Sequence, residues 1–158
     1  MKNKVFILGC GNLLFGDDGV GPAVIDYLIT NFKNRLNKNI QAIDMGTSVR
    51  DFLFDIVLSK DKPKKIIIID AQSEDTNPGE IKQIQLDHIS PKKISDFSLH
   101  QFPTINLLKE LKENTEIDIK IFVIGTKFVP EEVCPGLSNE IKEAIPKICE
   151  IVLKECEV

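Results

Sequence analysis

Carboxylate side chains follow three short apolar segments that have the length of β-strands. They are the adjacent pair Asp17 and Asp18, then Asp44, and then Asp70. In open α/β sheets, ligands bind beyond the carboxyl ends of the strands, so these groups are candidates for one common site. Asp70 directly follows four isoleucines, where a carboxylate is costly unless a cation, a hydrogen bond or a substrate meets it. Asp17 or Asp18 has a simpler alternative role, which is to cap the following helix.

Two histidines are present, and one of them lies in a sequence context that suggests a function. His88 sits beside Asp87 in a polar segment and is assigned no role. His100 lies in a segment with more apolar residues than a solvent-exposed loop needs. Two carboxylates and an imidazole from different loops would form a mixed nitrogen and oxygen site, which suits a divalent first-row metal.

The elements that must position these groups alternate between strand and helix. Apolar runs predict strands at Val5–Leu8, Ile40–Ile43, Lys64–Ile69, Glu80–Leu86 and Ile117–Ile124. Helical spacing begins near Pro22 and after Ser48, and it extends over Pro103–Glu113 and Ser138–Lys154. Continuous apolar strands are typical of buried parallel sheets with helices on both faces. We therefore expect one α/β domain over residues 1–158, a three-layer αβα sandwich. Its twisted sheet of about five strands is mostly parallel, and the weak fourth strand can be antiparallel.

Composition excludes several classes of protein. The chain has 158 residues and a formal net charge of −4, which disfavours binding to nucleic acid through phosphate contacts. No apolar stretch approaches the roughly 20 residues that span a bilayer, and the N-terminus lacks a secretion signal, so we expect a cytoplasmic protein without membrane insertion. Four widely separated cysteines predict reduced thiols, and Cys10 between two glycines predicts packing and not a nucleophile.

The glycine loop after the first strand does not match a nucleotide site. Leu14 stands where the third glycine of the dinucleotide fingerprint is needed, and the neighbouring aspartates would repel a pyrophosphate. The chain also lacks a P-loop and the G-x-S-x-G motif of serine hydrolases.

The segment Gly9–Gly21, GCGNLLFGDDGVG, resembles the N-terminal signature of the nickel–iron hydrogenase maturation proteases. These endopeptidases remove a C-terminal extension from the hydrogenase large subunit. The resemblance continues in order through Asp44–Thr47, Asp70, His100 and Pro135–Ser138. It implies that Asp18, Asp70 and His100 form a catalytic triad that contacts metal. The Phe102–Pro103 pair is similar to members that process the deazaflavin-reducing hydrogenases of methanogens.

The resemblance also implies a partner, a metal and a substrate loop. The partner is the precursor of a nickel–iron hydrogenase large subunit, and the expected metal is nickel that the substrate supplies, with no resident metal. Nickel, or a water that it holds, would polarise the scissile carbonyl, and either Asp18 or Asp70 would take a proton. We expect the substrate extension to be oriented by backbone-accessible loops at Gly11, Asn12, Asp44, Gly46 and Thr47.

Two other functions fit parts of this pattern. A phosphorelay receiver-like domain would use Asp17, Asp18, Asp70 and Lys127, although in receivers the acidic pair directly ends the first strand. A non-catalytic chaperone of the same hydrogenase subunit would keep the fold and would bind the precursor without cutting it.

Overall fold

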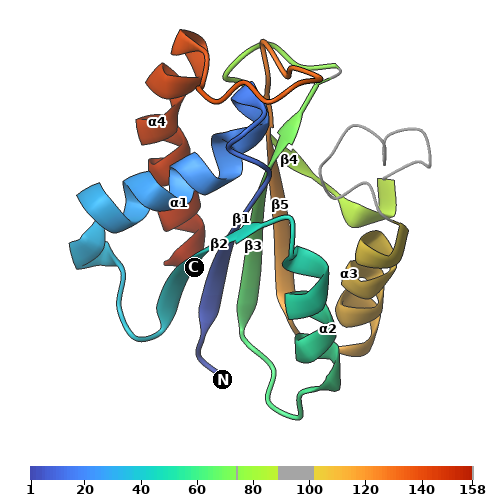
Figure 1. Cartoon of the computed structure of the whole chain (residues 1–158). Coiled ribbons are helices and arrows are strands. Elements are labelled where there is room, and N and C mark those ends of the chain that lie inside the picture. The colour runs from blue at the N-terminus through green and yellow to red at the C-terminus, as the bar shows by residue number, and fades with distance from the viewer. Residues whose placement is uncertain (74, 89–101, 158) are drawn as a thin grey trace.

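A computed structural model describes residues 1–73, 75–88 and 102–157, and it contains one five-stranded sheet (Figure 1). The strands are β1 (Val5–Cys10), β2 (Ile40–Gly46), β3 (Lys65–Gln72), β4 (Ile81–Ile84) and β5 (Asp118–Gly125). Their order across the sheet is β2-β1-β3-β5-β4. All neighbouring pairs are parallel except β4 and β5, which are antiparallel. The predicted sheet is therefore confirmed, including its antiparallel fourth strand.

In the described residues, four α-helices cover the two faces of this sheet (Figure 1). They are α1 (Val20–Asn31), α2 (Val49–Leu58), α3 (Phe102–Asn114) and α4 (Asn139–Cys156). Helices α1 and α4 pack together on one face, and α2 and α3 pack together on the other. This arrangement is the predicted three-layer sandwich. No helix in the described ranges is both long enough and apolar enough to cross a membrane.

The central strands form the middle of two apolar cores. Every residue of β1 and β3 is buried. Because side chains alternate along a strand, Phe6 and Leu8 pack toward α2 and α3, whereas Val5 and Ile7 pack toward α1 and α4. Burial on both faces explains why these strands read as continuous apolar runs. The rigid centre of the sheet thus carries the loops that leave its carboxyl edge.

The helix cap predicted after the glycine loop is wrong. Asp17 and Asp18 lie in a 3₁₀ turn, Gly16–Gly19, and Gly19 is the N-cap of α1 without a side-chain hydrogen bond. Both carboxylates instead reach groups outside the helix. The bounds of the strands also differ from the prediction: β1, β2 and β3 end later, at Cys10, Gly46 and Gln72, whereas β4 is shorter than the predicted Glu80–Leu86.

Candidate functional site

The loop after β1 folds back on itself and fixes Asp18. Gly11 has φ +133°, and a Cβ atom there would lie 1.9 Å from the carbonyl oxygen of Asp18, so only glycine fits. The Asp18 Oδ2 atom accepts a hydrogen bond of 2.9 Å from the backbone N–H of Asn12. Asp18 is half-buried. Its carboxylate is thus held just beyond the carboxyl end of β1.

Asp70 lies at the same edge, on the neighbouring strand β3. The ladder between β1 and β3 ends at the pair Gly9 and Ile69, so Asp70 is one residue past the last pair. On its other side β3 continues to pair with β5 as far as Gln72, and this pairing extends the strand beyond its predicted end. The Asp70 side chain is fully buried, and its Oδ1 atom accepts a bond of 2.8 Å from the N–H of Ala71.

Asp18 and Asp70 therefore share the carboxyl edge of two adjacent central strands, as predicted. His100, the third member of the predicted triad, lies outside the described residues. Within the described ranges, no three histidine, cysteine or acidic side chains form a group that could hold a metal ion. The catalytic and metal-binding roles of the triad remain predictions.

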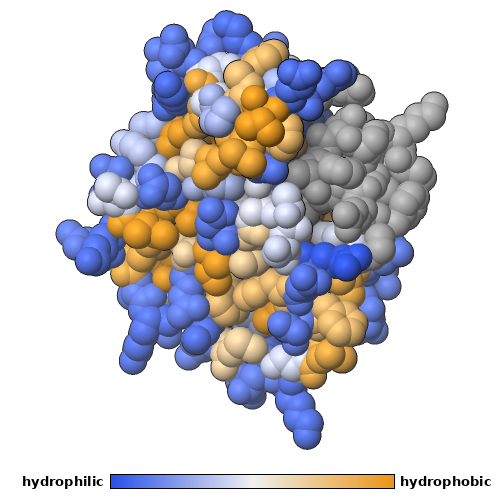
Figure 2. Space-filling model, in the orientation of Figure 1, coloured by the Kyte–Doolittle hydropathy of each residue, from blue (hydrophilic) through white to orange (hydrophobic). Residues whose placement is uncertain are grey.

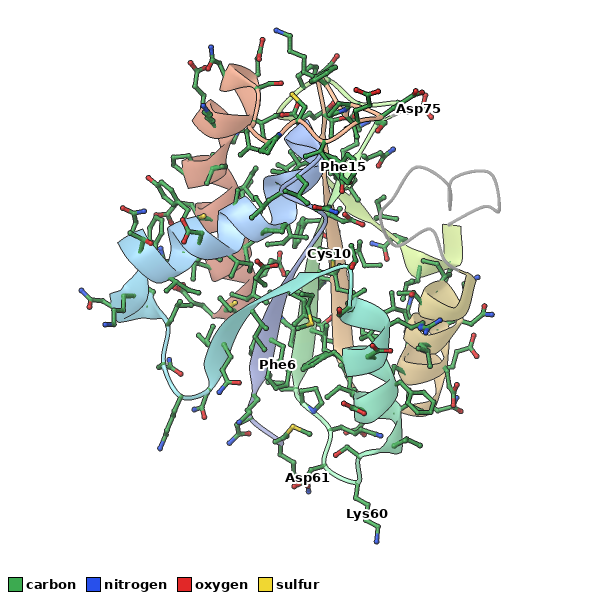
Figure 3. All side chains as sticks on the ribbon, viewed as in Figure 1. Phe6, Cys10, Phe15, Lys60, Asp61 and Asp75 are labelled. Atoms are coloured by element: carbon green, nitrogen blue, oxygen red, sulfur yellow. The ribbon has the colours of Figure 1, made fainter. Side chains whose placement is uncertain are left out.

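Cys10 is the last residue of β1, at the carboxyl edge of the sheet (Figure 3). Burial raises the pKa of its thiol well above the usual value, and the charges of Asp70 and Asp44 raise it further. The thiol therefore stays protonated at neutral pH and is a poor nucleophile. This agrees with the predicted packing role of Cys10.

The five residues predicted to contact substrate line one open pocket of about 250 Å³. They are Gly11, Asn12, Asp44, Gly46 and Thr47, and Leu13 and Pro22 complete the lining. One hydrogen bond joins the two loops, from the N–H of Gly11 to the carbonyl of Gly46 (2.9 Å). A second holds the end of β2 in shape, where the Asp44 Oδ1 atom accepts from the N–H of Gly46 (2.9 Å). The loops after β1 and β2 thus form one surface, although its role in substrate binding remains a prediction.

The pocket allows a direct test at Gly46. This residue has φ +51°, and a Cβ atom added to it would have no neighbouring atom within 4 Å, so Gly46→Ala adds a methyl group to an open wall. The left-handed backbone costs roughly 1–2 kcal/mol of stability. If a peptide backbone lies along this wall, we expect kcat/KM for precursor cleavage to fall about tenfold, because the methyl group prevents close approach. Thermal unfolding of the same variant is the control, because it should show only this small loss of stability and so separates an effect on the fold from an effect on cleavage. Equal turnover by Gly46→Ala and the wild type would remove the loop from the mechanism.

Asp17 has a structural role that the sequence did not identify. It is fully buried, and its Oδ1 atom accepts a bond of 2.6 Å from the N–H of Ser138. Its Oδ2 atom accepts from the Ser138 hydroxyl (2.8 Å) and from the N–H groups of Lys127 and Phe128 (2.9 Å each). Burial opposes ionisation of Asp17, but the bonds from Ser138, Phe128 and Lys127 outweigh it and lower the pKa of the carboxyl. Asp17 therefore joins the loop after β1 to the loop after β5 and the start of α4.

Three observations contradict the receiver-like alternative. A doubly wound receiver has the parallel strand order 2-1-3-4-5, whereas here β5 lies between β3 and an antiparallel β4. The amine of Lys127, which would have to reach the phosphorylated aspartate, bonds to Glu140 Oε1 at 2.6 Å instead. Asp17, one of the two expected magnesium ligands, has both oxygens occupied by the bonds described above.

Comparisons with known proteins agree with this geometry. The family model for hydrogenase maturation proteases matches residues 22–155. A Methanocaldococcus jannaschii protein with a provisional assignment as a hydrogenase maturation protease is 38% identical over 98% of this chain and 97% of its own. The coenzyme F420 hydrogenase subunit delta of Methanothermobacter thermautotrophicus is 35% identical over 98% of this chain and 96% of its own.

The solved structures give the same result. The hydrogenase maturation protease HybD from Thermococcus kodakarensis superposes with a TM-score of 0.70 at 28% identity, over 97% of this chain and 99% of that one. Sequence and fold therefore agree over almost the whole chain. The chain belongs to the hydrogenase maturation protease family, whose members are endopeptidases that act on a hydrogenase subunit.

Proposed function

We propose that this protease removes the C-terminal extension from the large-subunit precursor of a nickel–iron hydrogenase, after nickel has been inserted. The observation that carries the proposal is the position of Asp18 and Asp70 at one sheet edge, beside an open pocket. Asn12 connects the two features, because its N–H binds the Asp18 carboxylate and the residue also lines the pocket. A peptide that lies along the pocket is thus next to the Asp18 carboxylate.

The reaction is hydrolysis of one peptide bond. The oxygen of a water adds to the scissile carbonyl carbon, the C–N bond breaks, and the departing nitrogen takes the proton that the water gives up. We assign this proton transfer to Asp18, which is half-buried and within reach of water, whereas Asp70 is fully buried. Asp18, Asp70 and His100 would together contact the nickel ion that the substrate carries.

The ligand set supports nickel that arrives with the substrate. A catalytic zinc site normally has three protein ligands that neighbouring groups hold in place. The described part of the chain contributes only two carboxylates, Asp18 in the loop after β1 and Asp70 near the end of β3, and His100 would be the third ligand. Such a site is better suited to completing the coordination of an ion that another protein already holds than to retaining an ion by itself. Cleavage would then occur only after correct metal loading.

We further propose that the substrate is a deazaflavin-reducing hydrogenase. Two observations support this choice: the Phe102–Pro103 pair in the sequence, and the 35% identity to the protein named coenzyme F420 hydrogenase subunit delta. Coenzyme F420 is a deazaflavin. A large-subunit precursor from an F420-reducing enzyme is therefore the first substrate to test.

The test compares precursor with and without nickel. Purified protein is incubated with each form, and cleavage is followed by the shift in gel mobility. We expect only the nickel-loaded precursor to be cut, His100→Ala to stop the reaction without unfolding the domain, and the purified protease to contain little metal by elemental analysis. Tightly bound stoichiometric zinc together with cleavage of nickel-free precursor would contradict the nickel proposal. Binding of the loaded precursor without cleavage would instead identify a chaperone.

A further inference from the structure

Large apolar side chains gather on the surface beside the candidate site. We name this surface the apolar platform, and its members are Leu13, Leu14, Phe128, Val129 and Val133, each 41–64% exposed. In the described residues only three other large apolar side chains are as exposed: Ile29, Phe54 and Leu58. Figure 2 shows hydrophobic surface gathered at the upper end of the molecule, where the loop between β5 and α4 lies in Figure 1.

Backbone hydrogen bonds hold the two loops of the platform together. The N–H of Cys134 donates to the carbonyl of Leu14 (2.8 Å), and the N–H of Gly16 donates to the carbonyl of Cys134 (3.0 Å). The N–H of Asp17 donates to the carbonyl of Phe128 (3.0 Å), and the Asp17 carboxylate accepts from the N–H of Phe128. Because these bonds tie both loops to the buried Asp17, the apolar side chains are held at the surface.

The platform adjoins the substrate pocket. Leu13 belongs to the platform and also lines the pocket of Gly11 and Gly46. Any polypeptide that leaves the pocket on this side must therefore cross the platform. A fixed, exposed apolar surface next to a peptide site is typical of a protein interaction surface.

Charge indicates the chemistry of the partner. Glu131 and Glu132 are exposed between Val129 and Val133, and neither forms an ion pair with another described residue. The nearby cation, Lys127, is already paired with Glu140. A second copy of this chain in a two-fold contact would bring the same glutamates together, and like charges in contact disfavour that arrangement. An apolar segment with lysine or arginine beside it fits both the platform and its glutamates.

We infer that the apolar platform is the docking surface for the precursor subunit, and that it binds an apolar segment of that subunit bordered by basic side chains. The inference rests on the proposed function, since it names where that substrate binds. Docking here would place the rest of the precursor over the loops after β1 and β5 and direct its extension into the adjoining pocket. The platform would thus contribute to KM and not to the chemical step.

The test uses two double variants that are matched in chemistry. Phe128→Ser with Val133→Ser removes the centre of the platform, and Phe54→Ser with Leu58→Ser removes equally exposed apolar side chains on α2. Both should keep the wild-type melting temperature, because all four side chains are exposed. We expect the platform variant to raise both KM and the Kd for nickel-loaded precursor at least tenfold, with kcat within twofold of the wild type and the α2 variant unchanged.

Charge and self-association provide two further readouts. Raising the NaCl concentration should weaken precursor binding by the wild type, and this dependence should be reduced in the Glu131→Gln and Glu132→Gln double variant. The inference would be overturned if the platform variant and the wild type bound the precursor with equal Kd. It would also be overturned if the platform variant and the α2 variant lost the same amount of affinity. The inference would also be overturned if the wild type and the α2 variant sedimented as dimers and only the platform variant sedimented as a monomer. If the wild type binds precursor without cutting it, the proposed function fails, whereas a loss of binding confined to the platform variant still supports the docking surface.

Discussion

Asp70→Asn is expected to lower the rate of precursor cleavage by on the order of 10³-fold while the domain remains folded. The amide has the size of the carboxylate, and its oxygen can still accept the bond from the N–H of Ala71. The substitution removes the negative charge, however, and a neutral amide is a weaker metal ligand and proton acceptor. The effect should appear in kcat, because this charge acts on the reacting centre.

Cleavage kinetics and thermal unfolding, measured on the same preparation, check this prediction. Asp26→Asn is a suitable control, because Asp26 is exposed on α1, away from the carboxyl edge of the sheet. It should match the wild type in both measurements. Retention of more than a tenth of wild-type activity by folded Asp70→Asn would exclude Asp70 from the catalytic site.

Asp17→Asn is expected to reduce the free energy of unfolding by about 2–4 kcal/mol at pH 7. An amide presents one acceptor oxygen and an NH₂ group, and the NH₂ group would face N–H donors that now bond to the carboxylate. Because bonds from Ser138, Phe128 and Lys127 overcome burial and lower the pKa of Asp17, its charge stabilises the folded state. That contribution is fully present above the unfolded pKa of about 3.9 and is lost as the pH falls through the lower folded value.

Urea unfolding from pH 7 down to pH 3 measures this dependence. The wild type and Asp17→Asn should differ by a constant amount above about pH 5 and should converge as the wild-type carboxylate is protonated. A difference that stays constant down to pH 3 would show that the charge is not responsible. Unchanged stability at pH 7 would contradict the anchoring role, and with it the rigidity of the apolar platform.

The fold was predictable because its signal is local and repeated. Four isoleucines before Asp70 identify a strand that is buried on both faces, and the spacing of Val49, Leu53 and Ile56 identifies an amphipathic helix. The ends of the strands were less predictable. Asp70 continues β3 because β5 offers a partner there, and that pairing joins residues more than 50 positions apart.

The two adjacent aspartates show where sequence reasoning about the site reached its limit. Asp17 and Asp18 have the same chemistry, and a helix cap explained either one equally well. Their roles are separated by a 3₁₀ turn that directs Asp17 toward Ser138, about 120 residues away in the chain, and Asp18 toward Asn12. The apolar platform was equally inaccessible, because the exposure of Leu14 and Phe128 depends on how two distant loops pair.

Intact-mass spectrometry of a nickel-loaded large-subunit precursor, before and after incubation with this protein, shows whether the chain is a C-terminal processing protease. We expect the precursor to lose the mass of a single C-terminal peptide, that peptide to appear, and neither change to occur with Asp70→Asn. An unchanged precursor mass, or cuts at several positions along the subunit, would contradict this function.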